Sequence, residues 1–294
     1  MDLRRLGLFL AVVDEGGMTR AAEAAHVSQP SVSQAIRELE AEVGTPLFHR
    51  VGRRVVLTPA GEALVEPARQ VLRDVETGRA AVEAVAGLAA GRLDLVALPT
   101  LAVDPVAPLV GAFRLAHPGV DIALADPTDA SALVALVASG ECEIGITAEP
   151  VLASGLTSHE LGHQDLFAVL PPGANASHTM AVATLARFPL VTAPPGTTTR
   201  TQLEDAFDQA RVTPRIAVVT AQREAILPLV LAGAGATLFP GPLAEQAAAL
   251  GAVVVALRPR LARPVHLFHR AGPLSPAAAA FRELARVRAL RFPP

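Results

Sequence analysis

The stretch AAHVSQPSVSQAIRELE, residues 24–40, decides the fold of the first part of this chain. Ser28 is a suitable N-cap, and Pro30 falls in the first helical turn, where a missing backbone N–H costs nothing. Apolar residues then recur at spacings of four, three and four, the pattern of a buried helical stripe. They are Val32, Ile36, Leu39 and Val43. The face left outside is polar and holds Gln29, Pro30, Ser31, Ser33, Gln34 and Arg37.

Two further helices are predicted before this one, over about residues 2–14 and from an N-cap at Thr19. A tight turn at His26 and Val27 joins the second helix to the third, which gives a helix-turn-helix. In that motif the first residues of the second helix of the pair reach base edges in the major groove. Gln and Arg side chains match adenine and guanine in two-point contacts. The alternative is a polar helix face that only meets solvent.

The next segment, GTPLFHRVGRRVVLT at 44–58, predicts a β-hairpin wing. Arg50, Arg53 and Arg54 stand around a turn at Gly52, where they can meet phosphate groups or a minor groove. The net charge of the whole chain is −3, so no general basic surface attracts nucleic acid. Local placement of arginine must therefore carry any DNA contact.

Composition bounds the class of protein. Every one of the 25 basic residues is Arg, which indicates a GC-rich coding sequence and a bacterial source. A single cysteine, Cys142, fits a reducing compartment, and no apolar run reaches the ~20 residues of a membrane span. We expect a cytoplasmic protein with no membrane partner.

The run from Phe9 to Leu64 resembles the winged helix-turn-helix of LysR-type transcriptional regulators. The matching elements are the A-A-x-x-A/H-x-S-Q-P-S-x-S helix pair, the L-E-x-E-x-G-x-P-L-F-x-R step and the L-T-P-A-G exit. Gly17-Met18 departs from the usual Ser-Phe, and Gln34 stands where Arg is frequent, which leaves the base preference open. The resemblance implies a regulator and not an enzyme, without catalytic residues or a cofactor. Its implied partners are double-stranded operator DNA, RNA polymerase and a small-molecule effector.

A long linker helix is predicted from Thr58, its cap, to about Ala89. Apolar and small residues alternate at spacings of four and three along it, as in a heptad seam: Leu64, Ala68, Val71, Val75, Gly78, Val82, Val85 and Ala89. Dimerisation would bury this seam, and the family commonly pairs dimers into tetramers, so we expect a homodimer or homotetramer. The alternative is packing against the chain's own C-terminal domain.

From Arg92 onward, short β-rich runs alternate with helical segments such as 129–139, 198–210 and 221–232. This pattern predicts an α/β domain with a mainly parallel sheet. It also resembles the LysR-type effector domain, which has two lobes like a periplasmic binding protein. The expected domains are residues 1–58 for DNA binding, 59–89 for the linker and 90–294 for the effector. Within the last, lobe I covers about 92–162 and 268–294, and lobe II about 163–267.

Ligands of such sheets bind beyond the carboxyl ends of strands and at helix N-termini. Hydroxyl groups and one cation follow the predicted strands, which suits a small, anionic metabolite in the cleft between the lobes. The candidates are Thr100, Thr128, Thr147, Thr197, Thr198 and Arg200. Each threonine alone could instead be an ordinary helix cap.

The sequence HELGH at 159–163 raises the alternative of a zinc metallohydrolase. Zincins need this motif on a helix, with both histidines on one face. Here Gly162 interrupts it and a strand-like run begins two residues later, so we expect no metal site. His266 and His269 flank two residues of another predicted strand and should face opposite sides.

Overall fold

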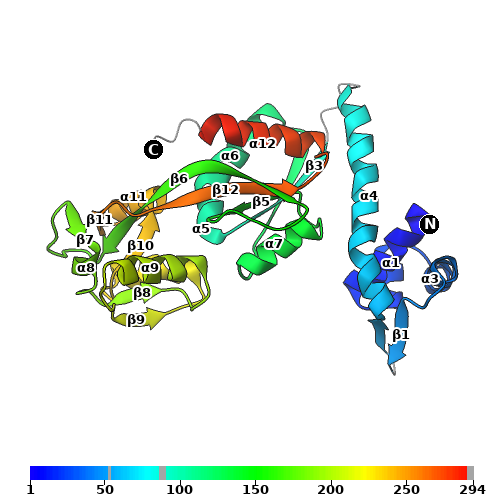
Figure 1. Cartoon of the computed structure of the whole chain (residues 1–294), viewed down its shortest axis with the longest axis horizontal. Helices are drawn as coiled ribbons and strands as arrows, with labels where there is room; N and C mark the ends of the chain where they lie inside the picture. Colours follow the sequence, from blue (N-terminus) through cyan, green and yellow to red (C-terminus); the bar gives the residue numbers. More distant parts are fainter. Residues whose placement is uncertain (52–53, 86–90, 290–294) are drawn as a thin grey trace. The chain divides into compact units, whose positions relative to one another are not determined.

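The computed structural model describes residues 1–51, 54–85 and 91–289, and the chain divides into two compact units. The first unit contains Met1–Ala90. In it, three helices and a hairpin precede one long helix (Figure 1). The elements are α1 (Leu3–Glu15), α2 (Met18–Ala24), α3 (Gln29–Val43), β1 (Phe48–Val51), β2 (Arg54–Leu57) and α4 (Pro59–Val85). The predicted order of a winged helix-turn-helix is confirmed.

Local capping explains most helix boundaries in this unit. The carboxylate of Asp2 accepts the N–H of Arg4 at 3.2 Å, and α1 ends at Gly16, whose φ of 64° is left-handed. The prediction that Thr19 caps α2 is wrong. The chain reverses at Gly16, so the carbonyl of Gly17 already accepts the N–H of Ala21 at 3.0 Å. The helix therefore starts at Met18 without a side-chain cap.

The core of the first unit draws on α1, α2, α3 and part of α4. Phe9, Val32 and Leu39 are fully buried in it. Leu64 and Ala68 of α4 also pack there, so the expectation that the whole linker seam is free for a partner is wrong at these two positions. Val71 and Val82 are exposed, at 40% and 71%. The predicted end of this helix, at Ala89, lies outside the described residues.

The second unit begins with three parallel strands and the helices beside them (Figure 1). The strands are β3 (Gly91–Ala97), β4 (Val120–Ala125) and β5 (Ile144–Thr147). The helical segments are α5 (Pro99–Leu101), the π-helical turn η1 (Ala102–Val106), α6 (Ala107–Ala116), α7 (Ala130–Ala138) and, at the end of the chain, α12 (Pro276–Ala289). Together these elements form lobe I. Phe113 of α6 and Phe281 of α12 pack in its core, with ring centroids 5.5 Å apart.

Two long strands, β6 (Leu156–Leu170) and β12 (Ala262–Arg270), run antiparallel and connect lobe I to the rest of the unit. The remaining elements form lobe II: β7 (Thr179–Ala181), α8 (Val182–Leu185), β8 (Leu190–Thr192), α9 (Thr198–Gln209), β9 (Ile216–Val219), η2 (Arg223–Ala225), α10 (Ile226–Leu231), β10 (Thr237–Pro240), α11 (Gly241–Ala249) and β11 (Val253–Arg258). The predicted α/β architecture of strands and helices is confirmed.

The prediction of a mainly parallel sheet is wrong, because the eight-stranded sheet is mixed. Its order is β4-β3-β5-β12-β6-β11-β7, with β10 beside β6. Every described pairing of β6 and β12 is antiparallel, with β5, β10, β11 and each other. The reason is the path of the chain, which leaves lobe I along β6 and returns in the opposite direction along β12. The predicted lobe boundaries fall inside these two strands and stay a prediction.

Lobe II has two clusters of buried apolar residues, one around Leu203 and Phe207 of α9 and one around Val230 and Phe239.

Among the described residues, no helix combines the length and apolar character needed to cross a membrane.

Candidate functional site

The surface of α3 presents the polar side chains that the sequence indicates. Ser28 caps this helix by accepting the N–H of Ser31 at 3.3 Å, and Pro30 lies in its first turn. Val32, Ile36 and Leu39 are buried, while Val43 is half-buried. Six predicted DNA-contacting residues lie along the opposite side. Gln29, Pro30, Ser31, Gln34 and Arg37 are exposed and Ser33 is half-buried.

A close approach of α2 and α3 holds this face in place. Ala21 and Ala22 are buried where the two helices meet, and alanine allows the short separation. His26 occupies the turn with a φ of 53°, a left-handed conformation that is uncommon outside glycine. The N–H of Val27 bonds back to the carbonyl of Ala22 at 2.9 Å. These contacts fix the direction in which the chain enters α3. The first turn of the helix is exposed to solvent.

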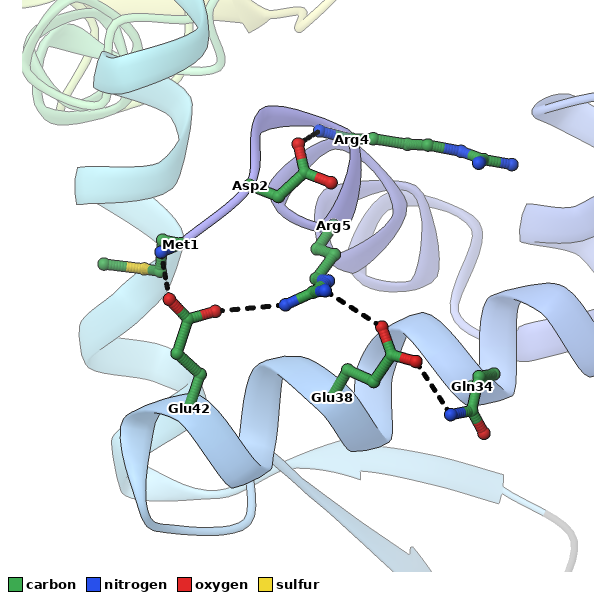
Figure 2. Close-up of polar contacts among 7 residues, drawn as sticks. All are labelled: Met1, Asp2, Arg4, Arg5, Gln34, Glu38 and Glu42. Atoms are coloured by element: carbon green, nitrogen blue, oxygen red, sulfur yellow. Dashed lines mark hydrogen bonds and ion pairs between the residues drawn. The ribbon is translucent and has the colours of Figure 1, made fainter.

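Hydrogen bonds fix the orientation of the two side chains best suited to read bases. The guanidinium of Arg37 donates to Gln34 Oε1 at 2.7 Å. Gln34 Nε2 in turn donates to Glu38 Oε1 at 2.8 Å, as Figure 2 shows. The Gln34 amide is therefore aligned between a cation and an anion before DNA arrives. A contact from this amide to a base edge would therefore require its donor and acceptor to give up these partners.

Arg5 of the neighbouring helix α1 supports this arrangement (Figure 2). It forms ion pairs with Glu38 at 3.1 Å and with Glu42 at 3.2 Å. The amino group of Met1 also bonds to Glu42 and, ahead of the nearby charge of Arg5, holds the pKa of this carboxyl below its usual value. These neighbours were not predicted, although the four-residue spacing of Gln34, Glu38 and Glu42 places them on one side of the helix.

The wing follows α3 directly, and Glu40 fastens it. Its carboxylate accepts the backbone N–H groups of Leu47 at 2.8 Å and Phe48 at 3.2 Å. The strands β1 and β2 pair in register, with Arg50 opposite Val55. Of the three predicted phosphate-binding arginines, Arg53 lies outside the described residues, and so do the side chains of Arg50 and Arg54. The predicted hairpin is confirmed, while the role of its arginines stays a prediction.

In the second unit, three of the six predicted effector residues gather around two adjoining hollows. Thr100, Thr128 and Thr197 line the first, together with Thr199 and Arg223. The second is lined by a partly different set: Thr100, Leu166, Thr199, Gln202, Leu238, Pro240 and Arg263. Each hollow measures about 10 Å³, roughly the room that one water requires. The two lobes contribute to both, since Thr100 follows β3 and Thr199 lies in the first turn of α9.

Of the other three candidates, Thr147 and Arg200 line neither hollow. Thr147 is buried at the end of β5, opposite His266 of β12, and lines neither hollow. Arg200 forms an ion pair with Glu204, one turn further along α9, at 2.7 Å. The backbone of Thr198 begins α9, but its side chain is outside the described part of the structure.

The charged group at the hollows is Arg263 of β12, which the sequence reasoning missed. Its side chain is 3% exposed, and burial lowers its pKa to about 10, still far above neutral pH. The guanidinium donates to Thr100 Oγ1 at 2.9 Å, to Gln202 Oε1 at 3.3 Å and, from Nε, to Gln164 Oε1 at 2.8 Å. All three acceptors are neutral.

No carboxylate among the described residues bonds directly to Arg263. The nearby acid, Asp104, is one step away, because Gln164 Nε2 donates to its carboxylate at 2.6 Å. A buried cation without a direct counter-charge is costly, since its desolvation is offset by neutral acceptors and by an acid that it does not contact. This arrangement is suited to an incoming anion. The signal in the sequence that could have found it is an arginine at the start of the strand-like run ARPVHLFHR, residues 262–270.

The HELGH segment forms part of strand β6 and not a helix. The strand begins at Leu156, earlier than the predicted run that follows the motif. The ring of His159 stacks on that of His269 at 5.5 Å, while His163 pairs with Glu160 at 3.5 Å. Burial lowers the pKa of both His266 and His269, which have different neighbours. Among the described residues, no group of three or more His, Cys, Asp or Glu side chains could hold a metal ion.

Comparisons with known proteins cover both units. Residues 3–62 match the family model of the bacterial regulatory helix-turn-helix protein, lysR family, and residues 86–289 match that of the LysR substrate binding domain. The RuBisCO operon transcriptional regulator of Allochromatium vinosum is 30% identical, over 99% of this chain and 98% of that protein.

A solved structure of full-length CbnR, complexed with its target DNA, is similar to this chain with a TM-score of 0.69 and 25% identity. The match covers 98% of this chain and 100% of CbnR. OxyR from Pseudomonas aeruginosa has the same fold, with a TM-score of 0.77 and 24% identity over 99% of this chain and 95% of that one. The chain belongs to the LysR-type family of DNA-binding transcriptional regulators, which are not enzymes, and carries their effector-binding domain.

Proposed function

We propose that this regulator reads its operator with the exposed face of α3 and changes its DNA binding when a small anionic metabolite enters the hollows around Thr100. The observation that carries the ligand class is Arg263, a buried cation whose direct acceptors are neutral. An anion that reaches it would supply the missing counter-charge. Thr100, Thr128 and Thr197 would donate or accept hydrogen bonds beside it.

Arg263 takes the place in this proposal that the sequence reasoning gave to Arg200. The ion pair with Glu204 already satisfies Arg200, so that residue has less attraction left for a ligand. The hollows are too small for a metabolite as they stand, so binding requires the lobes to move apart and close again. A ligand shifts such an equilibrium only by its difference in affinity for the two states, about 1–3 kcal/mol in typical allosteric proteins.

A thermal-shift screen of small carboxylates, phosphates and sulfonates against the full-length chain tests the ligand class. We expect the stabilising compounds to be anions, and the stabilisation to grow with ligand concentration as mass action requires. A screen in which only neutral or cationic metabolites stabilise the protein would contradict the anionic effector.

Replacing Arg37 by alanine tests the DNA-reading face. We expect operator affinity to fall by about 1–3 kcal/mol, because a two-point contact to a base is lost, while binding to random DNA falls much less. The measurement is fluorescence anisotropy with both DNAs at fixed salt. Arg286→Ala, an exposed position on α12, removes the same charge from the other unit and serves as the control. Equal loss on both DNAs would show that Arg37 contacts only phosphate.

We also propose a homodimer through α4, which can pair into tetramers. Val71 and Val82 are exposed on this helix, at 40% and 71%, and apolar side chains at such spacing suit a helix partner. The double change Val71→Glu and Val75→Glu is expected to give monomers in sedimentation, since unpaired charges buried in a seam cost several kcal/mol. The control pair Gln209→Glu and Gln246→Glu adds the same charge to exposed positions and should leave the dimer intact. A wild-type protein that sediments as a monomer contradicts the proposal.

We also propose that the protein is cytoplasmic, because a regulator that binds an operator must be where the bacterial DNA is. At the promoter it would act together with RNA polymerase.

A further inference from the structure

The DNA-reading helix α3 carries an acid, Glu38, one turn after Gln34 and on the same side. Its side chain is 43% exposed, so the carboxylate meets solvent and any DNA that approaches. A negative charge at this position opposes binding, because it repels the phosphates that the surface must come close to. This cost points to a role for Glu38 other than attraction to DNA.

Both carboxylate oxygens of Glu38 are engaged by neighbours in the same unit. Oε2 forms an ion pair with Arg5 Nη2 at 3.1 Å, and Oε1 accepts from Gln34 Nε2 at 2.8 Å (Figure 2). Arg5 comes from α1, and its Nη1 pairs with Glu42 at 3.2 Å, so the guanidinium is held between two turns of α3. Exposed ion pairs add little stability. The contribution of this one is to fix the Glu38 side chain with Oε1 toward Gln34.

The amide of Gln34 is held at both ends. Its oxygen accepts from Arg37 Nη2 at 2.7 Å while its nitrogen donates to Glu38, so each bond has a charged partner. The edge of an adenine would offer one donor and one acceptor in exchange, both uncharged. Charge-assisted hydrogen bonds are roughly twice as strong as neutral ones. The exchange of two charged partners for two neutral ones is therefore unfavourable for Gln34.

Arg37 is not restrained in the same way. A guanidinium has five N–H donors, and the described bond to Gln34 uses one nitrogen, Nη2. The side chain is also exposed. Arg37 can therefore keep its bond to Gln34 and still direct other N–H groups to a base edge or a phosphate.

We propose that Glu38, fixed by Arg5, is a positioning residue that masks Gln34 and thereby sets the base preference of α3. Glu38 acts through Gln34 and does not itself read a base. The base pair that faces Gln34 is read weakly, and the preference of the helix comes from other residues of its exposed face, Arg37 among them. The inference rests on the proposed function, in which this face reads the operator, and adds which of its side chains is silent.

Selection from a pool of DNA duplexes with a random central segment tests the mask and needs no known operator. The full-length wild type and each variant select sequences at the same salt concentration, and sequencing gives the base preference at every position. We expect Glu38→Ala to gain a preference for adenine at a position where wild type has none above about twofold. The gain should be about fivefold or more, the lower end of what a two-point base contact provides. Glu38→Ala combined with Gln34→Ala should lose it again.

Glu42→Ala is the matched control. It removes the same charge one turn further along α3, from a residue that pairs with Arg5 and not with Gln34 in the described contacts. This variant should bind all sequences more tightly, because one charge that repels phosphate is gone, and should gain no base preference. Alanine favours a helix, so both single variants are expected to fold, which circular dichroism checks.

Three results would overturn the mask. They are an adenine preference of wild type that Gln34→Ala removes, a Glu38→Ala protein with the base preference of wild type, and a gained preference that persists in the double variant. Each of them leaves the proposed function standing, since α3 would still read DNA. A wild-type protein that selects no sequence from the pool would instead contradict the proposed function itself.

Discussion

Replacing Gly61 by alanine is expected to destabilise the winged helix-turn-helix unit by about 3 kcal/mol or more and to abolish operator binding. A Cβ at this position would overlap the carbonyl oxygen of Leu47 and lie 2.8 Å from Leu57 Cδ2. The helix cannot retreat, because Thr58 holds it against the wing. The hydroxyl of Thr58 donates to the carbonyl of Pro46 at 2.7 Å and accepts the N–H of Gly61 at 3.0 Å.

The same helix provides a matched control. Gly78 is exposed on α4, and a Cβ there would meet nothing within 4 Å. Gly78→Ala should therefore stabilise the helix by about 0.5–1 kcal/mol, the usual gain from glycine to alanine in a helix interior. Urea unfolding followed by circular dichroism, beside an operator gel shift, measures both variants. If Gly61→Ala unfolds at the same urea concentration as Gly78→Ala, the close packing of α4 on the wing is not what holds this unit together.

Replacing Gln202 by glutamate is expected to stabilise the second unit and to abolish the response to an anionic effector. Gln202 Oε1 accepts from Arg263 Nη1 at 3.3 Å, so a carboxylate of the same shape supplies the counter-charge that Arg263 lacks. Hydrogen bonds to charged groups contribute about 1.5–3 kcal/mol, and we expect a gain in unfolding free energy at the lower end of that range. The new carboxylate also repels an anion, so effector affinity should fall at least 30-fold, or about 2 kcal/mol.

Gln209→Glu, an exposed position at the end of the same helix, adds an equal charge away from the hollow. It should change neither the melting temperature nor the affinity for the effector. Melting curves without ligand and calorimetry with the compound found by the screen separate the two effects. A Gln202→Glu protein that melts like wild type would mean that Arg263 already has sufficient electrostatic compensation. The case for an anionic ligand would then fail.

The features that the sequence predicts correctly depend on neighbours in the chain. The cap at Ser28 and the stripe of Val32, Ile36 and Leu39 need only the pitch of a helix, and the structure has both. The ion pair that satisfies Arg200 could also have been predicted, because Glu204 stands four residues later on the same helix. Reading Arg200 as a free cation ignored that local partner.

The features that the sequence could not supply depend on strand pairing over long distances. Arg263 is buried because β12 lies beside β6, where Arg263 is opposite Gln164, 99 residues earlier. The mixed direction of the sheet has the same origin, since strand direction follows the route of the chain and not the composition of each strand. Thr147 shows the same limit for a predicted site residue. It ends a strand as predicted, but β12 pairs with that strand and places His266 opposite Thr147.

The most direct test of the whole account is an operator-binding titration at fixed salt, with and without the anionic effector that the thermal-shift screen identifies. The account predicts that the effector changes the operator affinity of the wild-type protein and of Gln209→Glu, by about 5- to 150-fold, the range of typical allosteric coupling. Gln202→Glu should bind the same operator and show no change on addition of effector. An effector response of equal size in Gln202→Glu and wild type would contradict the claim that an anion at Arg263 controls DNA binding.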